Sequence, residues 1–263
     1  MLIGGVTMLG AINLYLFLRL SSRAPRFSEF LPIYWTAWAI GLVVPGQVGD
    51  MASVTALLHR RGHSWQAVLA RSLLDKLISF IVMILVAVFA LLPFVRGLSW
   101  QREWLIALMV VVPLTALFVY LLTQIKAARL SRWADKVSGI FSELTAILKK
   151  APGYVLLNVL LTLLKTFMMG AAYWAIFRAI GVVEIDILST VPLVAASALV
   201  AYIPVSFNGL GTVEAMGLML FASLGIAAPV VLAAYLALRL LVLALAWLPA
   251  GVWILSGRRE AAE

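Results

Sequence analysis

Long apolar runs dominate this sequence and limit the folds that it can form. Three of the longest cover residues 77–95, 104–122 and 229–255, and 64% of all residues are hydrophobic. A helix rises about 1.5 Å per residue, so about 20 such residues cross the hydrocarbon core of a bilayer. Because lipid offers no hydrogen-bond partners to the backbone, each run is expected to be helical. The sequence therefore excludes a water-soluble fold and predicts an integral membrane protein.

The order of runs and breaks predicts one all-α domain, a polytopic membrane helix bundle that covers residues 1–263. The first run has no basic segment before it and no small-residue cleavage site, so we interpret it as a retained span. Spans are expected at 2–20, 64–95, 104–124, 152–180 and 229–256, with broken helix pairs at 31–61 and 188–225 and a surface helix at 126–150.

The segment 126–150 differs from the spans because its apolar side chains fall on one face. Leu130, Trp133, Val137 and Leu144 recur at helical spacing between basic residues. This pattern predicts an amphipathic helix that lies in the membrane interface. A connector that covers one end of the bundle is favoured over a lipid-sensing device.

Each broken pair contains a Pro/Gly-rich break between two apolar stretches that are too short to cross a bilayer alone. The breaks read PGQVGD and PVSFNGLGTVE. Such breaks predict re-entrant hairpins. When the second half is aligned on the first, Gly62 meets Gly225 and Lys76 meets Arg239. The sequence thus predicts two similar repeats, at residues 31–95 and 188–256.

The direction of the repeats follows from the spans between them. An odd number of crossings separates the two hairpins, so hairpins that each enter and leave on one side would open in opposite directions, as inverted repeats do. The positive-inside rule places the more basic set of loops, and with it the C-terminus, in the cytoplasm. Met1 then lies outside, which favours a further span before it. The basic set includes Arg19, Arg23, Arg26, Arg60, Arg61, Lys149 and Lys150, and the other set holds Arg96, Arg102 and Arg178.

Basic residues lie deep in several predicted spans, where a charge costs about 2.5 kcal/mol or more. Half-helices that begin after the breaks would also direct free backbone amides inward, where anionic groups are favoured. Together these groups predict a central site for an anionic or phosphate-bearing headgroup. The candidate binding residues are Lys76, Lys165, Arg239, Gly46, Gly49, Gly209 and Gly211.

Acidic residues close to these positions offer partners for the buried cations. Asp50 and Glu214 follow the two breaks, where they could stand in for the anion until it binds. The candidate charge-pairing or gating residues are Asp50, Asp75, Glu214 and Arg71. The alternative is a neutral salt-bridge network that only fixes helix packing, and the sequence leaves both interpretations open.

Other candidate sites are weak. His59 and His63 have the spacing of a metal-binding pair, but two Arg and a Gly lie between them and no third ligand is near. We therefore predict no metal and no cofactor, and no catalytic motif is visible. The net charge of +9 is assigned to the membrane surface rather than to nucleic acid binding.

The segments PGQVGD, ARSLLDKL, GLGTVEA and ALRLLVLALAWLP resemble the lysylphosphatidylglycerol synthase transmembrane (flippase-domain) family, from about residue 31 to the end. The resemblance implies a stand-alone member with two inverted, re-entrant repeats in a bacterial cytoplasmic membrane. It also implies movement of lipids such as aminoacylated phosphatidylglycerol between leaflets. The departures from the family pattern are that Asp75-Lys76 replaces a Glu-Arg pair, that Ser79 replaces an Asp, that Val213 replaces an Arg, and that the family's usual first span is not apparent.

The favoured function is therefore that of a lipid transporter or flippase, whose partners are membrane lipids with anionic headgroups. One alternative is a non-transporting membrane partner of a lipid synthase or glycosyltransferase. Another is an intramembrane lipid-modifying enzyme that would use Asp50 or Glu214 as a base. A homo-oligomer is compatible with each of these functions.

Overall fold

The computed structural model describes residues 1–21, 23–44, 48–88, 131–203 and 206–260, and all regular structure in these ranges is helical. This confirms the predicted all-α class. The predicted span at 104–124 and residues 126–130 of the surface helix lie outside the described residues. The elements are α1 (Leu2–Leu18), α2 (Phe27–Gly41), α3 (Gly49–His59), α4 (Trp65–Val88), α6 (Ser131–Lys150), α7 (Pro152–Ala179), α8 (Ile187–Leu199), the 3-10 turn η3 (Val200–Tyr202), α9 (Thr212–Ala222) and α10 (Ala228–Glu260).

Most helices begin and end within a few residues of the predicted positions. α2 begins at Phe27 rather than at residue 31, because the helix includes the polar residues before the apolar run. Among these, Glu29 lies in the first turn, where the helix dipole favours an acid. α10 continues past the expected end at 256 to Glu260. α1 has 17 residues, fewer than the about 20 that a perpendicular crossing needs.

Exposure along α7 is the reverse of that in a water-soluble helix. Its outward face carries Leu156, Leu160 and Leu164, with exposed fractions of 60%, 54% and 47%. Its inward face carries Asn158 and Thr162, which have no exposed surface. Water would favour the opposite arrangement, whereas lipid favours apolar side chains outside and paired polar groups inside.

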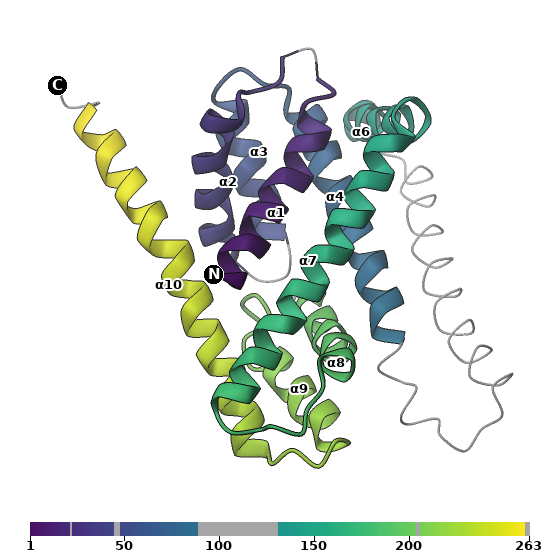
Figure 1. The fold of residues 1–263 in the computed structure, drawn as a ribbon. Coiled ribbons are helices and arrows are strands. Elements are labelled where there is room, and N and C mark those ends of the chain that lie inside the picture. Colours follow the sequence, from purple (N-terminus) through teal and green to yellow (C-terminus); the bar gives the residue numbers. More distant parts are fainter. Residues whose placement is uncertain (22, 45–47, 89–130, 204–205, 261–263) are drawn as a thin grey trace, which may run out of the picture.

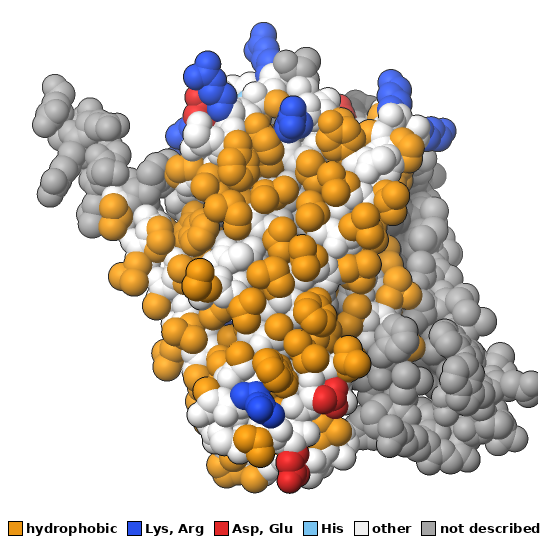
Figure 2. Space-filling view, viewed as in Figure 1, with side chains coloured by type: hydrophobic (Ala, Val, Ile, Leu, Met, Phe, Trp, Pro, Cys, Tyr) orange, Lys and Arg blue, Asp and Glu red, His pale blue; other side chains and the backbone are white. Residues whose placement is uncertain are grey.

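The surface of the described molecule supports the same conclusion. α7 and the segment Ala228–Val252 of α10 are long and apolar enough to cross a membrane. Figure 2 shows a broad belt of hydrophobic side chains across the face in view, with most of its Lys and Arg gathered at one end. A belt of this kind between polar ends is typical of an integral membrane protein.

Two helical hairpins enter the bundle from opposite ends (Figure 1). α2 runs inward and α3 returns to the end at which α6 lies, whereas α8 and α9 form a hairpin at the other end. The tips of both hairpins lie near the middle of the bundle. The depth of these tips in a membrane and the inverted symmetry of the repeats stay predictions.

Both hairpins are followed by the same kind of turn. Gly62 and Gly225 have positive φ angles of 87° and 74°, a conformation that glycine adopts without steric cost. The amide of the next residue donates to Leu58 O at 3.2 Å in the first turn and to Phe221 O at 3.4 Å in the second. This is the long hydrogen bond of the Schellman motif. The two glycines aligned in the sequence therefore share one local structure.

Each long helix packs against the hairpin of the other half. α4 contacts α8, and α10 contacts α2. Trp35 Nε1 in α2 donates to the carbonyl oxygen of Leu245 in α10 at 3.0 Å. Ala39 and Ala246 are fully buried between the same two helices. These crossed contacts join the two halves around a central space.

α6 lies across one end of the bundle (Figure 1). Its Leu144 and Ile147 side chains are 8% and 4% exposed and pack in one cluster with Leu74 and Ile78 of α4. Lys149, in the last turn, is exposed. This packing agrees with a connector that covers the bundle, and its location in the membrane interface stays a prediction.

Gly170 lets α7 approach α8 closely, and we expect Gly170→Ala to be destabilising. A Cβ atom there would lie 2.7 Å from the Cα of Val191, so the helices would have to separate at a cost of about 1–3 kcal/mol. Thermal unfolding of the protein in detergent would measure the loss. Gly153→Ala is the control, because no heavy atom lies within 4 Å of a Cβ at that position of α7. Equal melting temperatures for the two variants would contradict the close approach.

Candidate functional site

A cavity of about 350 Å³ lies where the hairpins meet the long helices. Most of its wall is apolar, with residues from α1, α2, α3, α4, α7, α8, η3, α9 and α10. The wall brings together charged residues that are far apart in the sequence. They are Asp50, Asp75, Lys76, Lys165 and Arg239.

Two ion pairs of the same design flank this cavity. Lys76 Nζ in α4 lies 2.6 Å from Asp50 Oδ2 in α3. Arg239 Nε in α10 lies 2.6 Å from Glu214 Oε1 in α9. Each pair therefore joins the second helix of a hairpin to the long helix that follows it. The two cations aligned in the sequence occupy equivalent places in these pairs.

The acids of these pairs also bind amides at the starts of their own helices. Glu214 Oε2 accepts a hydrogen bond from Gly211 N at 2.7 Å, which caps α9. Asp50 Oδ1 accepts one from Met51 N at 2.9 Å. These carboxylates thus accept hydrogen bonds from backbone amides at the helix starts, where the sequence predicted amides available to an anionic ligand.

Lys165 differs from the other two cations of the cavity. Its Nζ atom donates to Ser79 Oγ at 3.3 Å. Among the described residues, no carboxylate lies within ion-pair distance of it. Lys165 thus places a positive charge on the cavity wall with a neutral hydroxyl as its hydrogen-bond partner.

Asp75 also lies on the wall but is not part of an ion pair among the described residues. Its Oδ1 atom accepts a hydrogen bond from Asn158 Nδ2 at 2.9 Å. The sequence predicted that Asp75 would pair with the neighbouring cations. The side-chain amide that it bonds instead was not predicted.

Comparison with known proteins agrees with this architecture. The family model for the transmembrane region of lysylphosphatidylglycerol synthase matches residues 1–250. The chain belongs to this family. It is accordingly an integral membrane protein, and the match includes the first thirty residues, to which the sequence resemblance did not extend. No curated protein and no solved structure matches the chain.

The predicted glycines that the structure describes do not line the cavity. Gly49, Gly209 and Gly211 are absent from the described lining of the cavity, and Gly46 lies outside the described residues. Gly209 and Gly211 have φ angles of 76° and 83°, which permit the turn that leads into α9. Gly41 does line the cavity, and a Cβ there would lie 2.8 Å from Asp50 Cβ.

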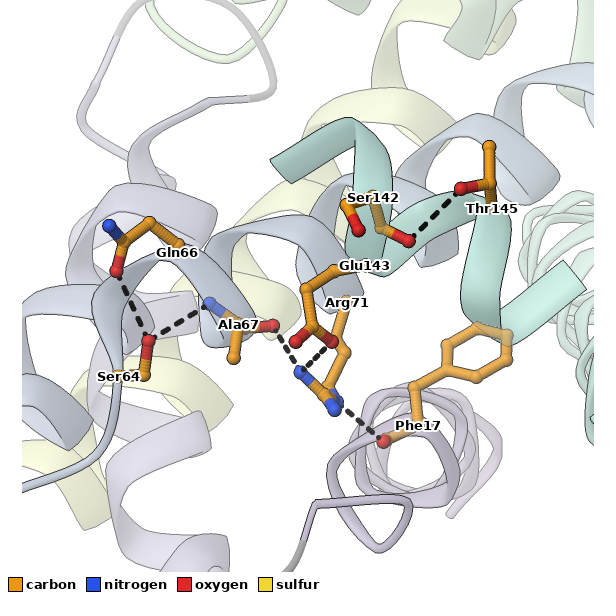
Figure 3. A network of polar contacts seen from close by, with 8 residues as sticks. All are labelled: Phe17, Ser64, Gln66, Ala67, Arg71, Ser142, Glu143 and Thr145. Atoms are coloured by element: carbon orange, nitrogen blue, oxygen red, sulfur yellow. Dashed lines mark hydrogen bonds and ion pairs between the residues drawn. The ribbon is translucent and has the colours of Figure 1, made fainter. Parts of the chain in front are cut away.

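Arg71 does not line the cavity and instead forms an ion pair with α6 (Figure 3). Its side chain is nearly buried, and Nη1 lies 3.2 Å from Glu143 Oε2 of α6. Its Nε atom donates to Phe17 O at the end of α1, at 3.0 Å, and Nη1 donates to Ala67 O at 2.8 Å. Arg71 thus joins α1, α4 and α6 at one end of the bundle.

A buried polar cluster beside the cavity was not among the predicted sites. Asn13 Nδ2 in α1 donates to Thr162 Oγ1 in α7 at 2.9 Å, and Asn158 lies one turn earlier in α7. A signal was present, because Asn158, Thr162 and Thr166 recur at four-residue steps in a leucine-rich segment. Polar residues at helical spacing in a membrane helix indicate its inward face.

Breaking the Glu214–Arg239 pair should cost more stability than breaking the Asp50–Lys76 pair. The Glu214 side chain is 6% exposed, whereas that of Asp50 is 26% exposed. Glu214→Gln leaves the guanidinium without an anionic partner and should cost about 3 kcal/mol. Thermal unfolding in detergent measures this loss, and Asp50→Asn is the less destabilised comparison.

A double variant provides the control for this prediction. Glu214→Gln combined with Arg239→Met removes both charges and should recover part of the lost stability, because no buried charge is then left unpaired. Wild-type stability in Glu214→Gln alone would contradict the assigned strength of the pair.

Proposed function

We propose that this protein moves an anionic or phosphate-bearing lipid between the two leaflets of a membrane. The observation that carries the proposal is the position of Lys165, a cation on the wall of a cavity inside a membrane helix bundle. A cation in this environment is costly unless it meets an anion or water. A lipid phosphate that enters the cavity would supply the missing negative charge.

The size of the cavity favours a headgroup over a whole lipid. Ligand pockets commonly measure about 300–1,000 Å³, and this cavity, at about 350 Å³, lies near the lower limit. The headgroup would therefore pass through the bundle while the acyl chains stay in the surrounding membrane. The exposed leucine face of α7 would remain in contact with those chains.

The two hairpin ion pairs offer a way to alternate access. Asp50 and Glu214 form ion pairs with the cations nearest the hairpins. Each acid lies in a helix that ends at a glycine turn. An arriving phosphate would compete with these acids for Lys76 and Arg239. Loss of one pair would release one hairpin while the other stayed closed, which is the rocking expected of two opposed repeats.

The distribution of exposed cations supports a proposed orientation in the membrane. Seven exposed cations lie at or near the end of the bundle where α6 lies, and we place this end in the cytoplasm. The C-terminus would then be cytoplasmic, in a bacterial inner membrane. The seven are Arg19, Arg23, Arg26, Arg60, Arg61, Lys149 and Lys150.

Lys165→Met tests the proposal in liposomes that contain fluorescent phosphatidylglycerol. The rate of lipid movement between leaflets should fall about tenfold or more, because a charge-assisted contact of about 1.5–3 kcal/mol is lost. Lys165→Arg should retain most of the rate, and Lys149→Met, at an exposed position of α6, should behave as the wild type. A neutral fluorescent glycolipid in the same liposomes shows whether the effect depends on the anion.

Other outcomes of this experiment would support different functions. A wild-type rate no higher than that of protein-free liposomes would contradict transport and favour a membrane partner of a lipid synthase or glycosyltransferase. Chemically altered lipid, detected by mass spectrometry, would favour an enzyme. An unchanged rate in Lys165→Met would contradict the role assigned to this lysine.

A further inference from the structure

A buried polar cluster lies at the junction of α1, α4 and α7, beside the cavity. Asn158 Nδ2 donates to Asp75 Oδ1 at 2.9 Å and to the backbone oxygen of Asn13 at 3.2 Å. Asn13, Asn158 and Thr162 have no exposed surface, and Thr162 and Asp75 both line the cavity. The cluster therefore connects the protein interior to the space that we assign to the headgroup.

The orientation of the Asn158 amide is fixed by its partners. Both partners are oxygen acceptors, so the nitrogen must face them and the amide oxygen must face elsewhere. That oxygen has no hydrogen-bond donor in the described part of the chain, and the same is true of Asn13 Oδ1 and Ser72 Oγ. An unsatisfied buried acceptor is destabilising. These oxygen atoms thus belong to Asn158, which bonds Asp75, to Asn13, which bonds Asn158, and to Ser72, which lies one turn before Asp75 in α4.

The Asp75 carboxylate also lacks an ion-pair partner among the described residues. Asp50 and Glu214 each have a cation at 2.6 Å, but no Lys or Arg in the described ranges lies within ion-pair distance of Asp75. Its hydrogen bond comes from a neutral amide. A carboxylate in the interior of a membrane protein is stabilised by uptake of a positive charge.

We propose that Asp75 and Asn158 form a binding site for a monovalent cation, either a proton or a sodium ion. A proton on the free carboxyl oxygen of Asp75 could donate to Asn158 Oδ1 and complete a two-bond acid–amide pair. A sodium ion would instead take oxygen ligands from the carboxylate, the amide and nearby hydroxyl groups, which are the ligands that hard cations prefer. Both occupants satisfy the same unpaired oxygen atoms.

The charges around the site favour one positive charge rather than two. The titratable or charged residues that share the cavity wall with Asp75 are Asp50 of α3, Lys76 of α4, Lys165 of α7, Arg239 of α10, Tyr34 of α2, Tyr173 of α7 and Tyr202 of η3. Asp50, Lys76 and Arg239 are already in ion pairs. Asp75 and Lys165 are the remaining charges of the described wall, one of each sign, and the nearby lysines disfavour a divalent ion at Asp75.

The site would couple a cation to the lipid, an extension that rests on the proposed function. Lys165 and Asp75 carry opposite charges on the cavity wall without forming an ion pair. A phosphate that binds Lys165 removes this balance, so the cation should bind Asp75 more tightly when the headgroup is present. By linkage, the cation strengthens headgroup binding by the same factor.

Cation binding can be measured without any lipid transport. The melting temperature of the purified full-length protein in detergent would be followed against NaCl, with choline chloride at equal ionic strength as the reference. Infrared spectra over the pH range in which the protein stays folded would detect a protonated carboxyl group. The variants are Asp75→Asn and Asn158→Leu, which nearly preserve shape, and the control is Asp186→Asn, whose carboxylate is exposed at the start of α8.

A sodium site predicts a saturable rise in melting temperature with Na⁺. This rise should be absent in Asp75→Asn and require about tenfold more Na⁺ in Asn158→Leu, a loss of about 1.4 kcal/mol. A proton site predicts a titrating carboxyl band that is absent in Asp75→Asn and shifted in Asn158→Leu. Asp186→Asn should match the wild type in both measurements. If wild-type protein shows neither signal, or if the signal persists unchanged in both variants, the proposal is overturned.

The cation site and the lipid function can fail separately. A cation signal that depends on Asp75, in a protein that moves no lipid in liposomes, would refute the proposed function and leave the site intact. Lipid movement that depends on Lys165, with no cation signal in the wild type, would refute the site and leave the function intact.

Discussion

The membrane interior provides no water to solvate a charge, and this constraint determines the arrangement of the bundle. Lys76 and Arg239 lie in long helices, and each is neutralised at 2.6 Å by an acid from the hairpin that precedes it. The same acids bind amides at the starts of α3 and α9. Each hairpin is thus attached to its long helix by one carboxylate that serves both as a counter-ion and as a ligand of backbone amides.

The crossed packing of the two halves gives these pairs a functional meaning. α4 contacts α8 and α10 contacts α2, so each long helix contacts both hairpins. A change in one ion pair would therefore be transmitted to the opposite half through packed helices. The cavity lies between the pairs, and Lys165, with a hydroxyl as its partner, adds the positive charge on which the proposed binding of an anionic headgroup rests.

Much of the fold could be predicted because it depends on local patterns. The breaks and their glycine turns appear in the sequence, and the alignment of Lys76 with Arg239 identified the two cations that form equivalent pairs. The site was less predictable. Asn158 is 83 residues from Asp75 in the sequence, and no helical spacing relates residues on different helices. Arg71 was predicted to be a charge-pairing or gating residue together with Asp50, Asp75 and Glu214, yet it lies nearer the end of the bundle, where Glu143 approaches from α6.

Photo-crosslinking in membranes tests the central claim most directly. Liposomes would contain a phosphatidylglycerol analogue with a photoreactive group on its headgroup, and labelled peptides would be identified by mass spectrometry. If the headgroup enters the cavity, the label should be found on inward residues such as Ser79 and Thr166 and should be lost in Lys165→Met. Label confined to the outward leucines of α7, unchanged by that substitution, would contradict a path through the protein.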